Sequence, residues 1–270
     1  MADNASQFVG DIPENYDKGL GPNIFDDYAA DLSHRAAALH PTRVLELACG
    51  TGIVSRKLKN AFGADTHLTI TDLNLPMLEV ARSKFTTDEN IEFATADAML
   101  LNFPDNHFDL VVCQFGVMFF PDKQASFREA LRVLRPSGSY LFNTWGEMSE
   151  NPFSQIAQEV SAQFFSNGPP GFYRVPFSYP DPAVVCADMS RAGFQKIEHE
   201  TICLQKNVKN WEMFARGLVF GNPLIDEIKE HGSIDPDEVM GAVKERLHAD
   251  FGPEPGPMPL KATVFCGRTD

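Results

Sequence analysis

A glycine-containing loop has the strongest chemical signature in this sequence. It reads VLELACGTG, residues 44–52, and lies between a strand-like apolar run and a helix-like pattern. Gly50 and Gly52 would let the backbone approach a ligand closely, as nucleotide-binding loops do. NAD-binding Rossmann proteins share this layout, but their fingerprint has a third Gly or Ala where this chain has Ser55. The loop therefore predicts a nucleotide-like cofactor and disfavours NAD.

Three carboxylates near this loop indicate which cofactor it could hold. Glu46 lies before the glycines, where it would hold a cationic amino group and repel a pyrophosphate. Asp72 ends the second predicted strand, where a carboxylate can accept hydrogen bonds from both hydroxyls of a ribose. Asp97 follows the third strand and could accept from an adenine amino group, with Ala98 and Met77 as apolar walls. This set favours S-adenosylmethionine (SAM), an adenosine joined to a cationic amino acid.

A layered core of strands and helices would position these residues. Strand-like and helix-like patterns alternate over residues 42–147, which is typical of an α/β fold with a mostly parallel sheet. The expected strands are 43–47, 67–71, 91–95, 108–114, 139–144, 196–205 and 260–267. The expected core helices are 53–61, 75–84 and 123–135.

The segments on either side of this core differ from it in composition. Residues 1–41 are predicted to form a lid segment and a helix that begins at Pro22, because apolar residues recur there at helical spacing. Residues 148–270 would add the last two strands and two cap insertions. Pro and Gly punctuate the first insertion, at about 148–180, which predicts an irregular aromatic cap. The second, at about 208–250, is predicted to be helical.

Composition argues against several classes of partner. The 270 residues carry a net charge of −14 with a pI near 4.9, and such a negative field repels phosphate backbones. We therefore expect no nucleic-acid substrate. The seven histidines and five cysteines form no HxxxH or CxxC pair, so we expect no metal. No segment reads as a membrane span or a secretory leader, which predicts a cytoplasmic protein with free thiols.

Four segments of the sequence, taken in this order, resemble those of a known family. They are VLELACGTG, TITDLNLPML with Asp72, ATADAMLLNFPDNHFDLVVCQFGVMFFPD with Asp97, and FREALRVLRPSGSYLF. Over residues 16–146 the chain resembles the class I SAM-dependent methyltransferases, in particular the ubiquinone/menaquinone-biosynthesis-like branch with type 11 domains. The resemblance implies a Rossmann-like, seven-stranded sheet whose last strand is antiparallel. It also implies SAM as methyl donor and S-adenosylhomocysteine (SAH) as product.

The same resemblance assigns residues to the parts of SAM. The segment NYDKGLGP is similar to the family's N-terminal lid, which places Tyr16 near the sulfonium. Ala48 departs from the pattern, since many members have the first glycine of the loop there, and a methyl group is usually tolerated. The implied cofactor-binding residues are Tyr16, Glu46, Ala48, Gly50 and Gly52 on the methionine side, Asp72 and Leu73 at the ribose, Met77, Asp97 and Ala98 at the adenine, and Gln114 near the amino acid part.

The methyl acceptor is expected to bind in the cap. Its many aromatic residues could form a pocket for a small, aromatic or apolar molecule, either ring-bearing or prenylated. His231 in the cap, His34 in the lid helix and Tyr16 are the candidate catalytic groups, and a base is needed only if the nucleophile arrives protonated. The expected pocket residues are Phe115, Trp145, Tyr173, Trp211 and Phe214.

Two other functions fit parts of the same pattern. A non-catalytic SAM-binding sensor or scaffold would keep the cofactor site without an acceptor. An NAD-dependent oxidoreductase would share the glycine loop and Asp72 but is disfavoured by Ser55. The preferred interpretation is an enzyme that methylates a small molecule.

Overall fold

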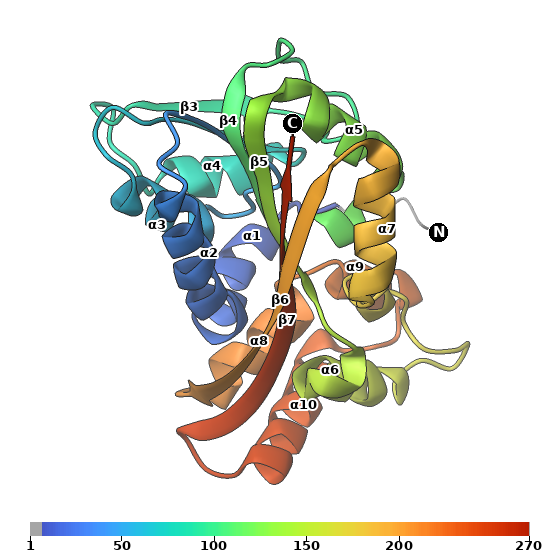
Figure 1. The fold of residues 1–270 in the computed structure, drawn as a ribbon. Coiled ribbons are helices and arrows are strands. Elements are labelled where there is room, and N and C mark those ends of the chain that lie inside the picture. Colours follow the sequence, from blue (N-terminus) through green and yellow to red (C-terminus); the bar gives the residue numbers. More distant parts are fainter. Residues whose placement is uncertain (1–6, 270) are drawn as a thin grey trace.

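The computed structural model describes residues 7–269 and contains one seven-stranded sheet with helices on both faces (Figure 1). The strands are β1 Arg43–Glu46, β2 His67–Asp72, β3 Ile91–Thr95, β4 Phe108–Gln114, β5 Leu134–Trp145, β6 Lys196–Val208 and β7 Gly256–Arg268. Their order is β3-β2-β1-β4-β5-β7-β6. Strands β1 to β5 pair in parallel, whereas β7 is antiparallel to β5 and β6. The predicted sheet is confirmed, including its antiparallel last strand.

The core helices cover the two faces of this sheet. They are α2 Asp26–Ala38, α3 Ile53–Ala61, α4 Leu75–Arg82, α5 Lys123–Val133 and α7 Pro182–Ala192. Figure 1 shows α2 and α3 on one side and α5 and α7 on the other. Successive side chains of a strand point to opposite faces, so Val44 packs in the cluster with α2, α3 and α4, and Leu45 in the cluster with α5 and α7. Burial on both faces explains why the core strands are so apolar.

The strand order reverses between β1 and β4. From β1 the chain moves outward through β2 and β3, and from β4 it moves in the other direction through β5. The carboxyl ends of β1 and β4 thus leave a crevice at a topological switch point, where open α/β sheets bind ligands. This arrangement brings the loop 47–52 beside the segment 115–121.

The N-terminal segment differs from its prediction. It forms a short helix α1, Ile12–Asn15, and a π-helical segment, Tyr16–Phe25, before α2 begins at Asp26. The expected start of a regular helix at Pro22 was wrong: the chain is already helical from Ile12, and Pro22, which lacks an N–H, lies inside the π-helical segment. The π-helical segment packs on α8, Trp211–Phe220. The two elements can approach because a Cβ on Gly19 would lie only 2.5 Å from the Cα of Gly217.

The cap contains more regular helix than the sequence predicted. Its helices are α6 Pro152–Ala162, α8, α9 Leu224–His231 and α10 Pro236–Phe251, and its short 3-10 turns are η3 Met148–Glu150 and η4 Phe172–Arg174; a further 3-10 turn in the core, η2 Val117–Phe119, follows β4. The prediction of an irregular segment was wrong for α6. Phe153, Ile156 and Val160 are buried there at helical spacing, but the prolines and glycines that flank them masked the pattern. In Figure 1, α6, α8 and α10 gather around the long ends of β6 and β7.

Candidate active site

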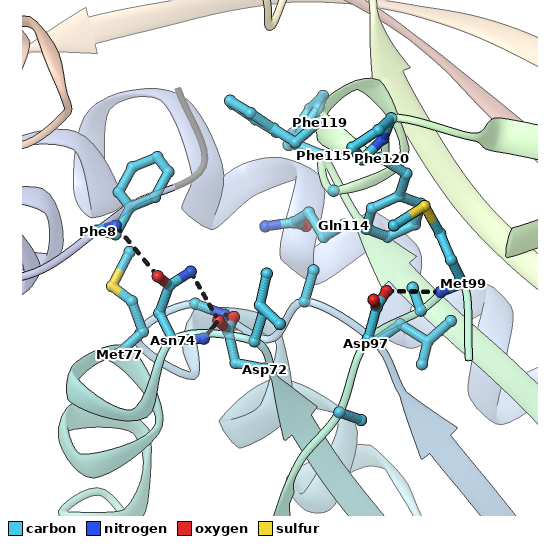
Figure 2. A pocket seen from close by; sticks show the side chains of 18 of the residues that line it. Phe8, Asp72, Asn74, Met77, Asp97, Met99, Gln114, Phe115, Phe119 and Phe120 are labelled. Carbon is cyan, nitrogen blue, oxygen red and sulfur yellow. Dashed lines mark hydrogen bonds between the residues drawn. The ribbon is translucent and has the colours of Figure 1, made fainter. Parts of the chain in front are cut away.

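A cavity of about 160 Å³ lies at the switch point of the sheet (Figure 2). Most residues that the sequence predicted for a cofactor meet there, although they come from segments far apart in the chain. Tyr16, Ala48, Gly50, Asp72, Leu73, Met77, Asp97, Ala98 and Gln114 line this cofactor cavity. Glu46 and Gly52 do not line it.

The glycine loop has left-handed backbone at three positions. The φ angle is 50° at Ala48, 56° at Gly50 and 79° at Gly52. Glycine adopts this region at no steric cost, and a Cβ on Gly52 would lie 2.8 Å from the Cβ of Ala81 in α4. Gly52 therefore permits close packing of α4 against the loop. Ala48 lines the cavity and bears a conformational cost that glycine would avoid.

Asp72, at the end of β2, fixes the shape of this loop. Its Oδ2 accepts the backbone N–H of Gly50 at 2.8 Å, and its Oδ1 accepts that of Asn74 at 2.7 Å. Burial raises the pKa of the Asp72 carboxyl, and these hydrogen bonds oppose the shift. A carboxylate has about four acceptor sites. Asn74 Nδ2 also donates to Oδ1, at a long 3.4 Å, and the remaining acceptor capacity of Asp72 is available to the cavity that it lines.

Gln114, at the end of β4, presents an unpaired acceptor at the cavity. Its Oε1 is buried and has no hydrogen-bond donor among residues 7–269. A buried acceptor without a partner is costly. A ligand that carries N–H donors, such as the amino group of SAM, fits this position.

Glu46 lies behind the loop, away from the cavity lining. It is fully buried, and its Oε1 accepts the hydroxyl of Ser55 at 2.9 Å. Burial raises the pKa of Glu46 to about 8. Its Oε2 has no donor within the described chain, so the predicted contact with the cofactor stays a prediction.

The second carboxylate at the cavity, Asp97, lies in the loop after β3. Its Oδ1 accepts the N–H of Met99 at 2.8 Å, and this turn leaves Ala98 and Met99 in the cavity lining. Figure 2 shows Asp72 and Asp97 along one edge of the cavity, with Gln114 between them in this view.

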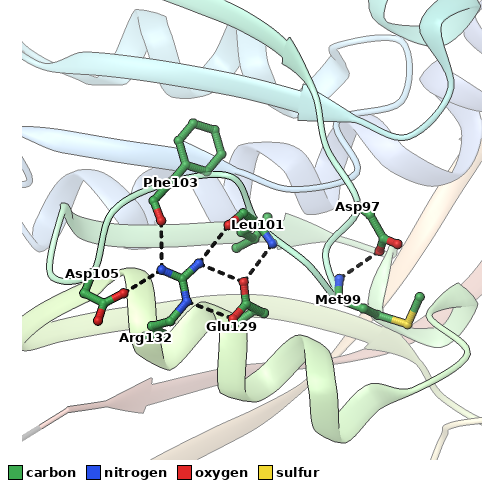
Figure 3. Close-up of polar contacts among 7 residues, drawn as sticks. All are labelled: Asp97, Met99, Leu101, Phe103, Asp105, Glu129 and Arg132. Atoms are coloured by element: carbon green, nitrogen blue, oxygen red, sulfur yellow. Dashed lines mark hydrogen bonds and ion pairs between the residues drawn. The ribbon is translucent and has the colours of Figure 1, made fainter.

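An Arg–Glu pair on α5 holds the loop that carries Asp97 (Figure 3). Arg132 donates five hydrogen bonds of 2.7 or 2.8 Å, to Leu101 O, Phe103 O, Asp105 Oδ1, Glu129 Oε1 and Glu129 Oε2. Glu129 Oε2 also accepts the N–H of Leu101 at 2.7 Å. The hydrogen bonds from Arg132 hold the pKa of Glu129 below its usual value. Both backbone groups of Leu101 are thus tied to α5, close to the cavity wall.

A second cavity, of about 60 Å³, adjoins the first and is called here the acceptor cavity. The two cavities share Phe8, Tyr16, Phe115 and Phe119. In its wall the ring of Phe115 stacks on Trp145, with centroids 3.9 Å apart and planes at 8°. Of the residues predicted for an acceptor pocket, Phe115, Trp145 and Tyr173 line it.

The other two predicted pocket residues belong to the core instead. Trp211 and Phe214 are 1% and 0% exposed and line neither cavity. The indole N–H of Trp211 donates to Gly252 O at 3.0 Å, and its ring stacks on Phe251 of α10. Their spacing places both side chains on the packed face of α8, which corrects the prediction.

Of the three catalytic candidates, Tyr16 alone lines a cavity. His34 is exposed on α2, and His231 contacts Ser166 and Ser233 at the end of α9. Tyr16 lines both cavities and stacks on Phe25 with ring centroids 4.9 Å apart. Burial, assisted by the charge of nearby Asp72, raises the pKa of Tyr16. Its hydroxyl therefore stays protonated at neutral pH and is a hydrogen-bond donor.

Several residues of the cofactor cavity were missed by the sequence analysis. Phe8 donates its backbone N–H to Asn74 Oδ1 at 3.3 Å, and its ring meets Tyr16 and Phe119 edge-on. An aromatic residue in an otherwise polar N-terminal segment was the available signal. The unpredicted lining residues shown in Figure 2 include Phe8, Asn74, Met99, Phe119 and Phe120.

Within 7–269, no group of three or more His, Cys, Asp or Glu side chains could hold a metal ion. No helix in that range is long and apolar enough to cross a membrane. All five cysteines are free thiols.

The core is similar in sequence to known methyltransferases. The model of a methyltransferase domain family matches residues 44–138. The ubiquinone/menaquinone biosynthesis C-methyltransferase UbiE of Pseudomonas aeruginosa (strain LESB58) is 31% identical over 173 residues, 59% of this chain and 68% of that protein. UbiE of Pseudomonas syringae pv. tomato is 42% identical over 125 residues, 45% of this chain and 49% of that protein. The chain thus spans about half the length of some curated relatives it matches.

Solved structures share the fold over most of the chain. The YcgJ protein of Bacillus subtilis matches with a TM-score of 0.58 at 20% identity, covering 90% of this chain and 98% of that one. Phosphoethanolamine N-methyltransferase 2 of Haemonchus contortus, solved with phosphomonomethylethanolamine and SAH, matches with a TM-score of 0.59 at 19% identity, covering 95% and 56%. At these identities the likeness concerns the fold.

Proposed function

Because the chain belongs to the class I SAM-dependent methyltransferases, in the branch that contains UbiE, we propose that it transfers the methyl group of SAM to a small, aromatic or apolar molecule. The observation that carries the proposal is the convergence of Asp72, Asp97 and the glycine loop on one cavity at the switch point. The adjoining acceptor cavity supports it. When bound, SAM supplies a methyl group that its sulfonium makes electrophilic.

The cofactor roles inferred from the sequence are part of this proposal. Asp72 accepts from the ribose hydroxyls beside Leu73, and Asp97 accepts from the adenine amino group. Gln114 Oε1 pairs with the amino group of the methionine part, which would satisfy its unpaired acceptor. The remaining contacts come from Tyr16, Ala48, Gly50, Met77 and Ala98, with Glu46 and Gly52 supporting the loop from behind.

The residues shared by the two cavities set where transfer takes place. Tyr16 and Phe115 belong to both linings, so the reacting atoms would meet between them. Holding two reactants in near-attack geometry supplies a large part of a rate enhancement. The aromatic wall also excludes water from the transfer point.

Proton transfer is assigned to the acceptor and solvent rather than to a histidine. His34 and His231 lie outside both linings, and the raised pKa of Tyr16 keeps it protonated. Tyr16 would then orient a polar atom at the transfer point by donating a hydrogen bond. A nucleophile that loses its proton to solvent before it enters the cavity reacts as an anion and needs no further base. A ring carbon would instead release its proton to solvent after it has received the methyl group.

The net charge and the free cysteines support two further assignments, the class of acceptor that is disfavoured and the compartment. The net charge of −14 disfavours nucleic acid as acceptor, and the free cysteines fit a reducing compartment such as the cytoplasm. We assign residues 1–41 to a lid segment, 42–147 to the SAM-binding core and 148–270 to the cap and last strands.

Calorimetric titration of the purified protein with SAH and NADH tests the cofactor, and release of SAH from SAM over a panel of small aromatic acceptors tests the activity. We expect micromolar SAH binding, no NADH binding and SAH release with at least one acceptor. Binding of NADH but not SAH would establish the oxidoreductase alternative. Tight SAH binding with no turnover on any acceptor, in purified form or in extracts, would establish a sensor.

A further inference from the structure

The acceptor cavity is lined by carbon almost throughout. Phe25, Phe153, Phe172, Phe177 and Leu218 contribute side chains without a polar atom. Among residues 7–269, no charged side chain lines this cavity. A charged group that entered it would lose its water and gain no counter-ion, which is strongly unfavourable.

The two polar side chains at the far end of the cavity bond to each other and to the chain. The hydroxyl of Tyr173 donates to Leu218 O at 2.7 Å. The amide of Asn222 donates to the Tyr173 hydroxyl at 3.3 Å and to Leu218 O at 2.9 Å, and its Oδ1 accepts the N–H of Leu224 at 3.0 Å. Both amide hydrogens and the hydroxyl hydrogen are used. This end therefore offers a ligand no free donor.

The remaining polar side chain is Tyr16, which lines both cavities. Burial and then the charge of Asp72 raise its pKa, and a Cβ added to Gly50 would lie 3.9 Å from Tyr16 Cε1. A hydrogen-bond acceptor atom of the substrate can thus be bonded by Tyr16 at the junction of the cavities, whereas the side chains of Tyr173 and Asn222 have no free donor for it.

The size of the cavity limits what can enter it. An engineered apolar cavity of about 150 Å³ binds benzene, whereas this one holds about 60 Å³, so a single ring would fill it and extend into the junction lined by Tyr16 and Phe115. Its walls are packed rings, including Trp145 stacked on Phe115 and on Phe177, with centroids 3.9 and 5.9 Å away. Close-packed rings leave little free volume beside the cavity for a long chain.

We propose that the acceptor cavity selects acceptors by an uncharged apolar group of about one ring held inside it, and that it excludes acceptors that would place a charge or a long prenyl or alkyl chain there. The proposal deepens the proposed function and rests on it. It narrows the expectation of a ring-bearing or prenylated acceptor to the ring-bearing kind, with its polar atom at Tyr16.

Tryptophan fluorescence can report occupancy of this cavity directly. The chain has two tryptophans; Trp145 lines the acceptor cavity and Trp211 lines neither cavity. In Trp211→Phe the fluorescence comes from Trp145 alone. If that variant does not fold, the wild type gives the same ranking over a constant Trp211 background. Probes are titrated at pH 7 into protein saturated with SAH, whose binding is measured separately by calorimetry.

The probes are p-cresol, its cationic analogue tyramine, its anionic analogue 4-hydroxyphenylpropionate, and 4-alkylphenols of increasing chain length. We expect p-cresol to quench Trp145 with a dissociation constant at least about tenfold lower than either charged analogue. We also expect affinity to stop rising within the first few methylenes, although each buried methylene would otherwise strengthen binding about fourfold. The cavity-filling variant Leu218→Phe should bind SAH normally and lose p-cresol.

Three results would overturn the proposal: equal or tighter binding of a charged analogue, affinity that rises with every added methylene, or p-cresol quenching that survives in Leu218→Phe. Because SAH binding is measured independently, these results differ from failure of the cofactor site. A protein that binds p-cresol in this pattern but not SAH would refute the proposed function and leave the cavity's selectivity established.

Discussion

The two cavities meet at Tyr16 and Phe115, yet they are built in different ways. The cofactor cavity is shaped by backbone: a loop with positive φ angles and two carboxylates at strand ends. The acceptor cavity is shaped by carbon side chains from the N-terminal segment, β5 and the cap. The first is specified by short segments of the core, and the second by packing among distant segments. Acceptor choice can therefore change while the cofactor site stays the same.

The largest effect is expected at Glu46, where the pH dependence of stability tests how much the fold around the glycine loop depends on a buried acid. Burial raises its pKa from 4.5 to about 8. Its contribution to stability is thus fully present below pH 4.5 and is lost as the pH rises to about 8. Urea denaturation of the wild type at pH 5 and pH 8.5 should show about 4 kcal/mol of this loss. Glu46→Gln mimics the protonated acid, keeps an acceptor for Ser55 and should lack this component.

The matched control is Glu230→Gln, which replaces an exposed acid on α9. It should keep the pH dependence of the wild type. If Glu46→Gln keeps it too, the buried acid does not govern the stability of the loop.

Phe177→Ala tests whether binding in the acceptor cavity can be weakened without weakening SAH binding in the cofactor cavity. Phe177 is 8% exposed and stacks on Trp145, and a large-to-small change in a packed site costs about 3 kcal/mol. We expect the free energy of unfolding to fall by that amount and p-cresol to bind more weakly by Trp145 fluorescence. The affinity for SAH should stay within about twofold of the wild type, well under the tenfold that 1.4 kcal/mol represents.

Phe194→Ala provides the comparison for this variant. Phe194 is 3% exposed, packs on Tyr140 and lines neither cavity. It should lose similar stability and keep both ligands. Equal weakening of SAH and p-cresol in Phe177→Ala would show that the two cavities act as one site.

Asp72→Ala tests the backbone-shaped cavity in the same way. The change removes the acceptors for Gly50 and Asn74 and the proposed acceptors for the ribose. With about 1.5 kcal/mol for each hydrogen bond to a charged group, we expect the calorimetric dissociation constant for SAH to rise about 100-fold.

Asp109→Ala is the control, because Asp109 also accepts two backbone N–H groups, from Thr42 and Arg43, each at 2.8 Å. It lies at the opposite end of the parallel strands, away from both cavities. It should lower stability and leave SAH affinity unchanged. Similar SAH affinities in the two variants would mean that Asp72 acts only by holding the fold.

This contrast also explains what could be predicted from the sequence. Strands 91–95 and 108–114 and helix 53–61 were predicted with the bounds that the structure has, because their apolar patterns and caps are local. Nine of the residues predicted for a cofactor line the cofactor cavity, because strand ends and glycines have fixed positions in such a sheet.

The acceptor side could not be predicted in the same way. Helix α6 was hidden by the prolines and glycines around it, and the aromatic spacing of Trp211 and Phe214 does not say which neighbour their helix faces. Phe8 and Asn222 reach the cavities through tertiary contacts, for which the sequence contains no periodic signal. Which aromatic residues face a ligand depends on packing between segments that are far apart.

The smallest effect is expected at Arg132, a residue of α5 that holds the loop after Asp97 by hydrogen bonds. Arg132→Met removes five hydrogen bonds, three of which hold the loop after Asp97 to α5 (Figure 3), but no atom that lines the cavity. We expect SAH affinity to fall about fivefold, near 1 kcal/mol. Arg135→Met also removes a guanidinium, whose partner is Asp109 at 2.6 Å, and should leave SAH affinity unchanged. If the two variants bind SAH alike, local backbone shape alone positions Asp97, and the packing of α5 contributes nothing to the cofactor cavity.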